Sequence, residues 1–597
     1  MSAPPASEAD GLLARPNSVL RERATAAQGI LALAGLVAVS LCLFLPLANP
    51  DIFWHLSAGR YIFAHKGLPV ADFLSWSKAG QPWTDFEWLP QLFYYSGWQL
   101  AGDRGLLACR LLLSLPLLFM LYRTALLYTG RLTALLAVSV WGAALLPNLD
   151  LRPENFSLLF FAVVFYLLEK TRLSARAERR EEYAAACAVL FVLWANCHAG
   201  FVYGLLLLGF YCAGEFLRVK LPAIYGRREN EDFSIFKTYA LWLACAAAGT
   251  LLNAYGVKIY SVLLAHAREI KVIGEHLREW QPAELNQLAQ SPFWVLLAVS
   301  ALVLLQRALR RRDLPFPLLL SWLFFAVSAA QHVRTTAFFA LTTVPFLLHL
   351  LSLYEKEGVP SLRLKLGVSV VAMAATCFLF FAAHRYLDGP RWRYTAGAQG
   401  PVRYLAAEKA VLSGVKLYNP WGWGGYIGFK LWPDYKVFQD GRYIFHNYLP
   451  EVEAARGDNL SWERFLSKYG FQAVLLERSR SSYATKVALG PLGERTLRFP
   501  FYSFFMPGSE WALVYWDEKS MLFVRRTEAL REWLVKNEFR AFKPDNAEAL
   551  RAKLDAGLQD KEVLKQEAGR LEKLLNGLGA AQDAGAVRVY AHELLLP

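Results

Sequence analysis

The sequence predicts a polytopic α-helical membrane protein with about eleven transmembrane helices, a C-terminal extracytoplasmic α/β domain and a short helical tail. Two observations point to this fold class. The 597 residues are 55% hydrophobic and 14% aromatic, which is too apolar for an ordinary soluble enzyme. The apolar residues form long runs up to about position 384, and beyond it the runs are short and separated by glycine, proline and charge.

Eleven apolar runs approach the roughly 20 residues that a membrane-crossing helix needs. The short runs at 156–169, 183–197 and 291–306 give the weakest signal. The runs lie near 27–49, 104–128, 132–148, 156–169, 183–197, 200–217, 237–254, 291–306, 315–330, 336–353 and 364–384. The first run follows a polar, basic tail at 1–26 and lacks an AxA-type cleavage site after it, so we expect a signal anchor that is retained.

Charge in the connections predicts the topology. When the runs cross alternately, every connection on one side carries Lys or Arg, including KTRLSARAERREE, RVKLPAIYGRREN and RALRRRD. By the positive-inside rule these connections and the tail 1–26 are cytoplasmic. The first outer loop (50–103), the segment 255–290 and everything after 385 are then outside. We expect a bacterial cytoplasmic membrane protein whose N-terminus is cytoplasmic and whose C-terminus is periplasmic.

The net charge of +14 is explained by these short loops, which meet lipid head groups, so we expect no nucleic-acid partner. The seven cysteines lie within or at the ends of apolar runs, so the sequence offers no disulfide framework and no CxxC metal site. The outer segment 255–290 contains HAREIKVIGEHLREWQPAEL, whose spacing predicts an amphipathic helix on the membrane surface.

Three parts follow from the pattern: a transmembrane domain (27–384), a periplasmic α/β domain (385–525) and a helical appendage (526–597). In the α/β domain, VKLYN, KVFQD, QAVLLE, WALVYWD and SMLFVRR predict strands, and PVRYLAAEKAVL and LSWERFLSKYG predict helices. The appendage has Leu at spacings of three and four, like a pair of helical repeats. It is a candidate surface for a protein partner.

The first outer loop contains three carboxylates beside membrane helices: Asp51, Asp85 and Glu87. Acidic residues at the mouth of a membrane helix are costly unless they pair, bind a cation or take part in chemistry. One interpretation is structural: Asp51 caps a helix, and Asp85 or Glu87 pairs with Arg60 or Lys66. The other is a site, because the three lie among aromatic residues and a histidine. These neighbours are Trp54, His55, Trp83 and Trp88.

At this point the sequence resembles the GT-C superfamily of membrane glycosyltransferases, whose first outer loop opens with an acidic residue directly after the first helix. The motifs are similar to those of a bacterial group of GT-C-like proteins and span roughly residues 45–480. They are DIFWHLSAGRYI, GLPVADFLSW, GQPWTDFEWLPQ, LRPENFSLL, WANCHAGFVYGLLLL, NPWGWGGYI and KVFQDGRYIF. The resemblance implies a sugar taken from a polyprenyl-phosphate donor at the outer membrane face.

The resemblance also implies residue roles. Asp51 would be the catalytic base or would help to hold a divalent cation such as Mg²⁺ or Mn²⁺. Asp85 or Glu87 would be the second acidic residue, Glu87 the second metal ligand, and His55 a further catalytic candidate. Trp54 and Trp88 are candidates for contacts with the substrate.

A leaving phosphate needs positive partners, and four outer-side residues are candidates: Arg152, His198, His332 and Arg334. Arginine suits this role because its planar fork can hold phosphate oxygens in a bidentate manner. The alternatives are snorkelling to the head groups for Arg152 and Arg334, and hydrogen-bonded packing for His198. In the soluble domain, NPWGWGGYI predicts a close backbone approach, and Asp440, Gly441 and Arg442 predict a turn with an Asp–Arg pair.

The sequence therefore favours an enzyme that transfers a sugar from a polyprenyl-phosphate donor to a glycan, lipid or protein acceptor. The alternative is a non-catalytic lipid-handling, transport or scaffold subunit of an envelope assembly. Transporters tend to show internal repeats and helices broken near the midplane, and no convincing repeat is present here. The informative residues lie at the outer ends of helices instead.

Overall fold

The computed structural model describes residues 9–174, 180–220, 233–310, 314–359, 361–388, 397–490 and 493–595. It divides into two compact units, each described here by itself. The first contains Met1–Leu47 and Thr84–Arg391, and the second contains Ala48–Trp83 and Trp392–Pro597. The predicted orientation depends on basic connections, and parts of three of them, at 175–179, 221–232 and 311–313, lie outside the described residues, as do residues 1–8 of the N-terminal tail.

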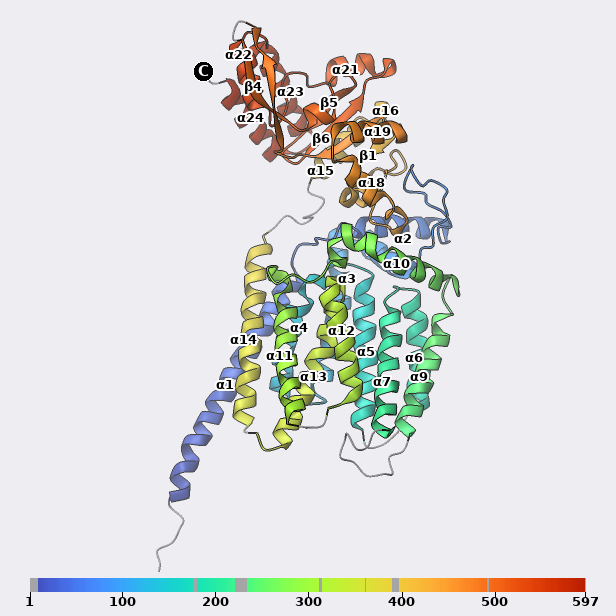
Figure 1. Ribbon diagram of the computed structural model, residues 1–597, viewed down its shortest axis with the longest axis vertical. Coiled ribbons are helices and arrows are strands. Elements are labelled where there is room, and N and C mark those ends of the chain that lie inside the picture. The colour runs from blue at the N-terminus through green and yellow to red at the C-terminus, as the bar shows by residue number, and fades with distance from the viewer. Residues whose placement is uncertain are drawn as a thin grey trace, which may run out of the picture. The chain divides into compact units, whose positions relative to one another are not determined.

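The first unit is helical, and Figure 1 shows its long helices running side by side. Each of the eleven predicted apolar runs overlaps one described α-helix, and a twelfth α-helix of the unit, α10, lies outside these runs. The helices are α1 (Ala9–Leu43), α3 (Trp88–Ala125), α4 (Arg131–Leu145), α5 (Glu154–Leu173), α6 (Arg180–Ala195), α7 (Phe201–Lys220), α9 (Ser234–Thr250), α10 (Lys258–His276), α11 (Ser291–Leu309), α12 (Phe316–Gln331), α13 (Thr336–Lys356) and α14 (Ser361–Tyr386).

Among the described residues, seven helices are long and apolar enough to cross a membrane, and Glu182–Ala195 and Phe316–Gln331 are shorter apolar helices. Large side chains such as Trp141, Trp194 and Trp242 fill the core between the helices. Of the amphipathic segment predicted at 266–285, the part up to His276 lies in α10, and Arg278–Trp280 form the short 3-10 helix η2. The multi-pass helical fold predicted from the sequence is confirmed.

The first outer loop is shorter than predicted. Instead of continuing to residue 103, it gives way to helix at Trp88, and the helix breaks at Ala101 and Gly102 before the predicted span begins. Gly102 has φ of 55°, a conformation that glycine adopts without steric cost, and this allows the break. The earlier part of the loop, Ala48–Trp83, belongs to the second unit.

The second unit is built on a mixed four-stranded sheet in the order β1-β2-β6-β5. These strands are β1 (Leu417–Tyr418), β2 (Ala473–Glu477), β5 (Trp511–Trp516) and β6 (Ser520–Arg525). β1 is parallel to β2, and β6 is antiparallel to both β2 and β5. β2, β5 and β6 are apolar along almost their whole length because α-helices of the same unit, such as α15 (Gln399–Ala407), also pack on the sheet.

Two strand expectations were wrong. KVFQD is not a strand: it makes only an isolated bridge between Val437 and Ser75, because the side chain of Asn419 takes the backbone groups of Phe438 and Gln439. A separate hairpin, β3 (Ser482–Ala488) and β4 (Glu494–Pro500), was not predicted. Its residues are largely exposed, so it lacks the apolar alternation on which the strand predictions depended.

The start of the first outer loop forms α2 (Ile52–His65), which packs against α17 (Gly424–Leu431) of the NPWGWGGYI motif. A Cβ added at Gly425 would lie 3.1 Å from the Trp54 nitrogen and 3.3 Å from the Pro50 carbonyl oxygen. The glycine therefore allows the two helices to approach closely, as the motif predicts.

The C-terminal helices are α21 (Arg531–Asn537), α22 (Ala547–Asp555), α23 (Lys561–Gly577) and α24 (Ala581–Leu595). The sequence predicts that residues 526–597 form a separate helical appendage. In the structure, their buried side chains belong to the same apolar core as the sheet, with Leu564, Leu571 and Leu575 beside residues of β2 and β6. The helices are thus part of the folded unit.

Leu571→Ala tests this shared core. Leu571 is fully buried, so we expect the substitution to lower the free energy of unfolding by about 2–5 kcal/mol, the usual effect of truncating a core leucine. Thermal unfolding of the purified full chain measures the effect. Val589→Ala on α24 is the control, because Val589 is exposed and its truncation should change stability by less than about 0.5 kcal/mol. Equal effects of the two variants would contradict a shared core.

Candidate active site

Two arginines of the first unit share one carboxylate. Arg152 lies just before α5, Arg334 lies in the short helix η4 (Val333–Thr335), and Glu279 lies in η2 (Arg278–Trp280). Arg334 Nη1 donates to Glu279 Oε1 at 2.9 Å, and Arg152 Nη1 donates to Oε2. The Arg152, Glu279 and Arg334 side chains are 34%, 30% and 23% exposed. We call these three residues the arginine bridge.

The arginine bridge is held in place by its surroundings. The Arg334 guanidinium lies 5.3 Å from the ring centroid of Trp280, a cation–π contact, and its Nε is 3.9 Å from the buried Glu154 carboxylate. Burial acts to raise the pKa of Glu279, but Arg152 and Arg334 outweigh it and lower the pKa to about 2. Glu279 is therefore ionised at neutral pH.

His198 lies beside the arginine bridge in the loop between α6 and α7. Its Nδ1 accepts the backbone N–H of Gly200 at 3.0 Å and lies 2.8 Å from Ser157 Oγ, which itself accepts from Trp194 Nε1. Because Nδ1 is an acceptor, the proton of the neutral ring is assigned to Nε2. Burial and the charge of Arg334 hold the pKa of His198 well below its usual value, so the ring is neutral at pH 7.

Nε2 of His198 faces two charged groups, Glu87 Oε1 at 3.8 Å and Arg334 Nη2 at 3.4 Å. Glu87 occupies the position before α3 but its side chain makes no capping hydrogen bond. His332 is held separately, because its Nδ1–H donates to the Trp280 carbonyl at 2.8 Å. The structure thus brings Glu87, His198 and Arg334 together, with His332 two residues away from Arg334 in the chain.

Asp85 and Trp88 have other neighbours. The Asp85 carboxylate is buried and accepts from Gln91 Nε2 at 2.5 Å. Trp88 Nε1 donates to Asn196 Oδ1 at 3.1 Å, and the same oxygen accepts the Ala254 N–H. Asn196 of the WANCHAG motif therefore joins the start of α3 to the segment after α9.

Asp51 belongs to the second unit and directly precedes α2. Its side chain makes no capping hydrogen bond, so the helix-cap interpretation is wrong. A Cβ added at Gly441 would lie only 2.1 Å from Asp51 Oδ1 and 3.2 Å from Trp54 Nε1, so both groups approach this glycine. His55 is buried, with its ring centroid 3.6 Å from that of Trp54.

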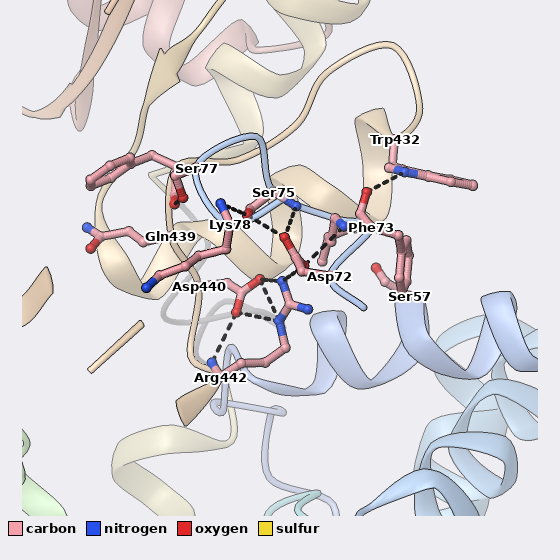
Figure 2. A network of polar contacts seen from close by, with 12 residues as sticks. Ser57, Asp72, Phe73, Ser75, Ser77, Lys78, Trp432, Gln439, Asp440 and Arg442 are labelled. Carbon is pink, nitrogen blue, oxygen red and sulfur yellow. Dashed lines mark hydrogen bonds and ion pairs between the residues drawn. The ribbon is translucent and has the colours of Figure 1, made fainter. Parts of the chain in front are cut away.

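Arg442, next to Gly441, lies between two carboxylates (Figure 2). Its Nη2 is 2.8 Å from Asp440 Oδ2 and 2.7 Å from Asp72 Oδ1. Asp72 also accepts the backbone N–H groups of Leu74 and Ser75. We call Asp72, Asp440 and Arg442 the Arg442 network; it contains the Asp–Arg pair predicted from the sequence.

The pairing of Asp85 or Glu87 with Arg60 or Lys66 stays a prediction. Arg60 lies over the rings of Phe429 and Trp432, and Lys66 is exposed in a left-handed conformation that ends α2. Within the described ranges, no group of three or more His, Cys, Asp or Glu side chains could hold a metal ion. Mg²⁺ or Mn²⁺ binding by Asp51 and Glu87 therefore stays a prediction.

Sequence reasoning missed the acidic and polar partners of the residues that it selected. Glu154 lies in the quoted motif LRPENFSLL, Glu279 in the amphipathic outer segment, and Asp72 in GLPVADFLSW. One feature of the sequence could have indicated them. A cation near the end of a membrane helix needs a counter-charge, and Glu154, Glu279 and Asp72 are carboxylates of the predicted outer segments. Their pairing across the fold was not readable from spacing.

The sequence matches no protein-family model and no curated relative. The structure is similar to archaeal oligosaccharyltransferase AglB from Archaeoglobus fulgidus, solved with an inhibitory peptide and a dolichol-phosphate. The TM-score is 0.52 at 11% identity, over 95% of this chain and 86% of that one. The chain has the GT-C fold.

A second similar structure is apo ArnT from Cupriavidus metallidurans, with a TM-score of 0.43 at 15% identity, covering 84% of this chain and 99% of that one. The fold expected from the motifs is confirmed by the likeness to AglB. At this sequence identity the GT-C likeness concerns the fold, so activity must be argued from the residues of the site.

Glu279→Gln tests the arginine bridge. The variant removes the charge that two guanidiniums share, so we expect the free energy of unfolding to fall by about 1–3 kcal/mol at pH 7. The folded-state pKa, about 2, lies below the reference value of 4.5. The wild-type advantage should therefore be complete above pH 4.5 and shrink as the pH falls from 4.5 towards 2.

Thermal unfolding of the purified full chain at pH 7, 5.5 and 3 measures this difference. Glu284→Gln is the matched control, because Glu284 is an exposed carboxylate of the same outer segment. A difference that already disappears between pH 7 and 5.5 would contradict the low pKa of Glu279.

Proposed function

We propose that this protein is a membrane glycosyltransferase that moves a sugar from a polyprenyl-phosphate-linked donor to an acceptor at the outer face of a bacterial cytoplasmic membrane. The arginine bridge carries this proposal. It offers two guanidiniums, partly open to solvent, that already hold an anion between them. A donor phosphate has the charge and the oxygen geometry to replace the Glu279 carboxylate.

The GT-C fold supports the choice of donor. The AglB structure contains a dolichol-phosphate, which is a polyprenyl-phosphate lipid. Arginine side chains that always stayed paired with Glu279 would be poor phosphate ligands. If the phosphate replaces the Glu279 carboxylate, however, the two guanidiniums keep an anionic partner. We therefore assign Arg152 and Arg334 to the donor phosphate.

The reaction is a displacement at the anomeric carbon. The acceptor hydroxyl oxygen attacks this carbon, the bond from the carbon to the phosphate oxygen breaks, and its electron pair leaves with the phosphate. The hydroxyl proton passes to Asp51, which keeps the role of base given to it by the GT-C resemblance. Neutral His198, whose Nε2–H faces the Glu87 carboxylate at 3.8 Å, serves to orient Glu87.

The proposal retains the predicted orientation, with the N-terminus cytoplasmic and the soluble unit periplasmic, because the basic connections favour it. The acceptor is a glycan, a lipid or a protein that offers a nucleophilic oxygen. The C-terminal helices are proposed to contact a protein partner through their exposed faces. Because these helices share a core with the sheet, surface substitutions are a better test of that contact than deletion of 526–597.

Asp51→Asn should abolish transfer, lowering kcat by at least about 100-fold, because the amide cannot accept the hydroxyl proton. The assay follows release of undecaprenyl phosphate by mass spectrometry, with a panel of undecaprenyl-phosphate-linked hexoses and pentoses and the full chain in vesicles. Asp434→Asn, a carboxylate on the surface of the same unit, should retain full activity. Full activity of Asp51→Asn would remove Asp51 from the mechanism.

Arg334→Lys should weaken binding of undecaprenyl phosphate about tenfold, because lysine retains the charge but cannot hold two phosphate oxygens in a fork. Native mass spectrometry of the full chain in detergent measures the dissociation constant. Arg268→Lys on the exposed face of α10 is the control and should leave it unchanged. Equal affinity of wild type and Arg334→Lys would show that Arg334 is not a phosphate ligand.

A further inference from the structure

The contact between Asp51 and Gly441 is so close that a side chain at position 441 would displace the Asp51 carboxylate. A Cβ built there would lie 2.1 Å from Oδ1 and 3.0 Å from Cγ of Asp51, and 3.2 Å from Trp54 Nε1. Carbon and oxygen atoms that are not bonded do not approach within 3.0 Å at no cost, so any larger residue would push the carboxylate away. Gly441 is thus the surface against which the Asp51 carboxylate rests.

The turn that carries Gly441 is fixed on both sides. After it, Arg442 donates to both oxygens of Asp440 from Nε, and its backbone N–H donates to Asp440 Oδ1 at 3.0 Å. Before it, the Gln439 carbonyl accepts from Asn419 Nδ2 at 2.8 Å. A Cβ at Gly424 would lie 1.9 Å from the same carbonyl oxygen, so α17 closes over this side of the turn.

The turn is also anchored to the segment that follows α2. Asp72 contacts Arg442, Val437 forms an isolated parallel bridge with Ser75, and the Trp76 N–H donates to the Val437 carbonyl at 3.0 Å. Figure 2 shows Asp72 and Asp440 on either side of the Arg442 guanidinium. Both ends of the loop segment, Asp51 at its start and the 72–76 stretch near its end, therefore meet one turn.

We propose that Gly441 is a positioning residue for Asp51: its missing side chain, in a turn locked by the Arg442 network, sets where the Asp51 carboxylate lies. The turn that contains Gly441 then determines the position of the base. This inference rests on the proposed function, in which Asp51 accepts the proton. It assigns the need for glycine at position 441 to catalysis as well as to packing.

Gly441→Ala is the decisive variant. Displacement of a general base slows the chemical step more than it weakens substrate binding. We therefore expect kcat to fall by about 10–100-fold, while the KM for the undecaprenyl-phosphate-linked donor changes less than about twofold. Gly422→Ala is the matched control. Gly422 lies in the NPWGWGGYI motif of the same unit, and a Cβ there would meet no atom within 4 Å. Its kinetics should equal those of wild type.

A double-mutant cycle measures the contact without using activity. Gly441→Ala alone should lower the melting temperature by about 2–4 °C, the usual cost of overpacking in a unit of this size. In an Asp51→Ala background the same change should cost less than about 1 °C, because Oδ1 and Cγ are gone. In an Asp51→Asn background the cost should persist, because the amide occupies the same space.

The outcomes separate the two proposals. Coupling in the cycle together with the loss of kcat supports positioning of Asp51 by Gly441. Unchanged kcat in Gly441→Ala, or equal melting shifts in all three backgrounds, would overturn it even if Asp51→Asn is inactive. If Asp51→Asn retains transfer while the coupling is present, the base assignment fails and the contact is structural only.

Discussion

Arg442 is the residue on which the second unit depends, because its guanidinium holds carboxylates from two distant parts of the chain. Asp440 is its near neighbour in sequence, whereas Asp72 comes from the first outer loop. The side chains of all three are almost fully buried, at 1% exposure or less. Buried charges persist only when they are paired and hydrogen-bonded, so folding of the unit requires these distant segments to meet.

The Arg442 network contains two carboxylates for one guanidinium, and the excess negative charge must be stabilised in another way. Burial raises the pKa of Asp440, while Arg442 opposes this shift. Asp72 gains additional donors from the backbone N–H groups of Leu74 and Ser75 and from the Ser75 hydroxyl at 2.5 Å. The loop around Asp72 is therefore shaped by the need to satisfy a buried carboxylate, and this brings the loop against the turn that contains Gly441.

Much of this architecture could be predicted from the sequence, but the partners of its charges could not. The apolar runs predict the helices because each needs only local length and composition, and the GT-C motifs predict the fold. The break at Gly102, the loss of the KVFQD strand to Asn419, and the sharing of Leu571 with the sheet core are tertiary effects. Spacing marked Arg152 and Arg334 as candidates, yet it could not show that Glu279, more than 50 residues before Arg334, lies between them.

The exposure of each charged cluster indicates which one can exchange its anion. The Arg442 network is sealed, so replacing a carboxylate there would require the unit to open, and its function is structural. In the arginine bridge each side chain retains between 23% and 34% exposure, so water and solutes reach the contacts between Glu279 and the two guanidiniums. Solvent partly screens an ion pair in that setting, so a solute anion can compete with Glu279 for the two guanidiniums. A phosphate, with more charge and more acceptor oxygens than a carboxylate, competes well for two forked cations under these conditions. On the proposed function, the same chemical pair is structural where it is buried and a phosphate site where it is open.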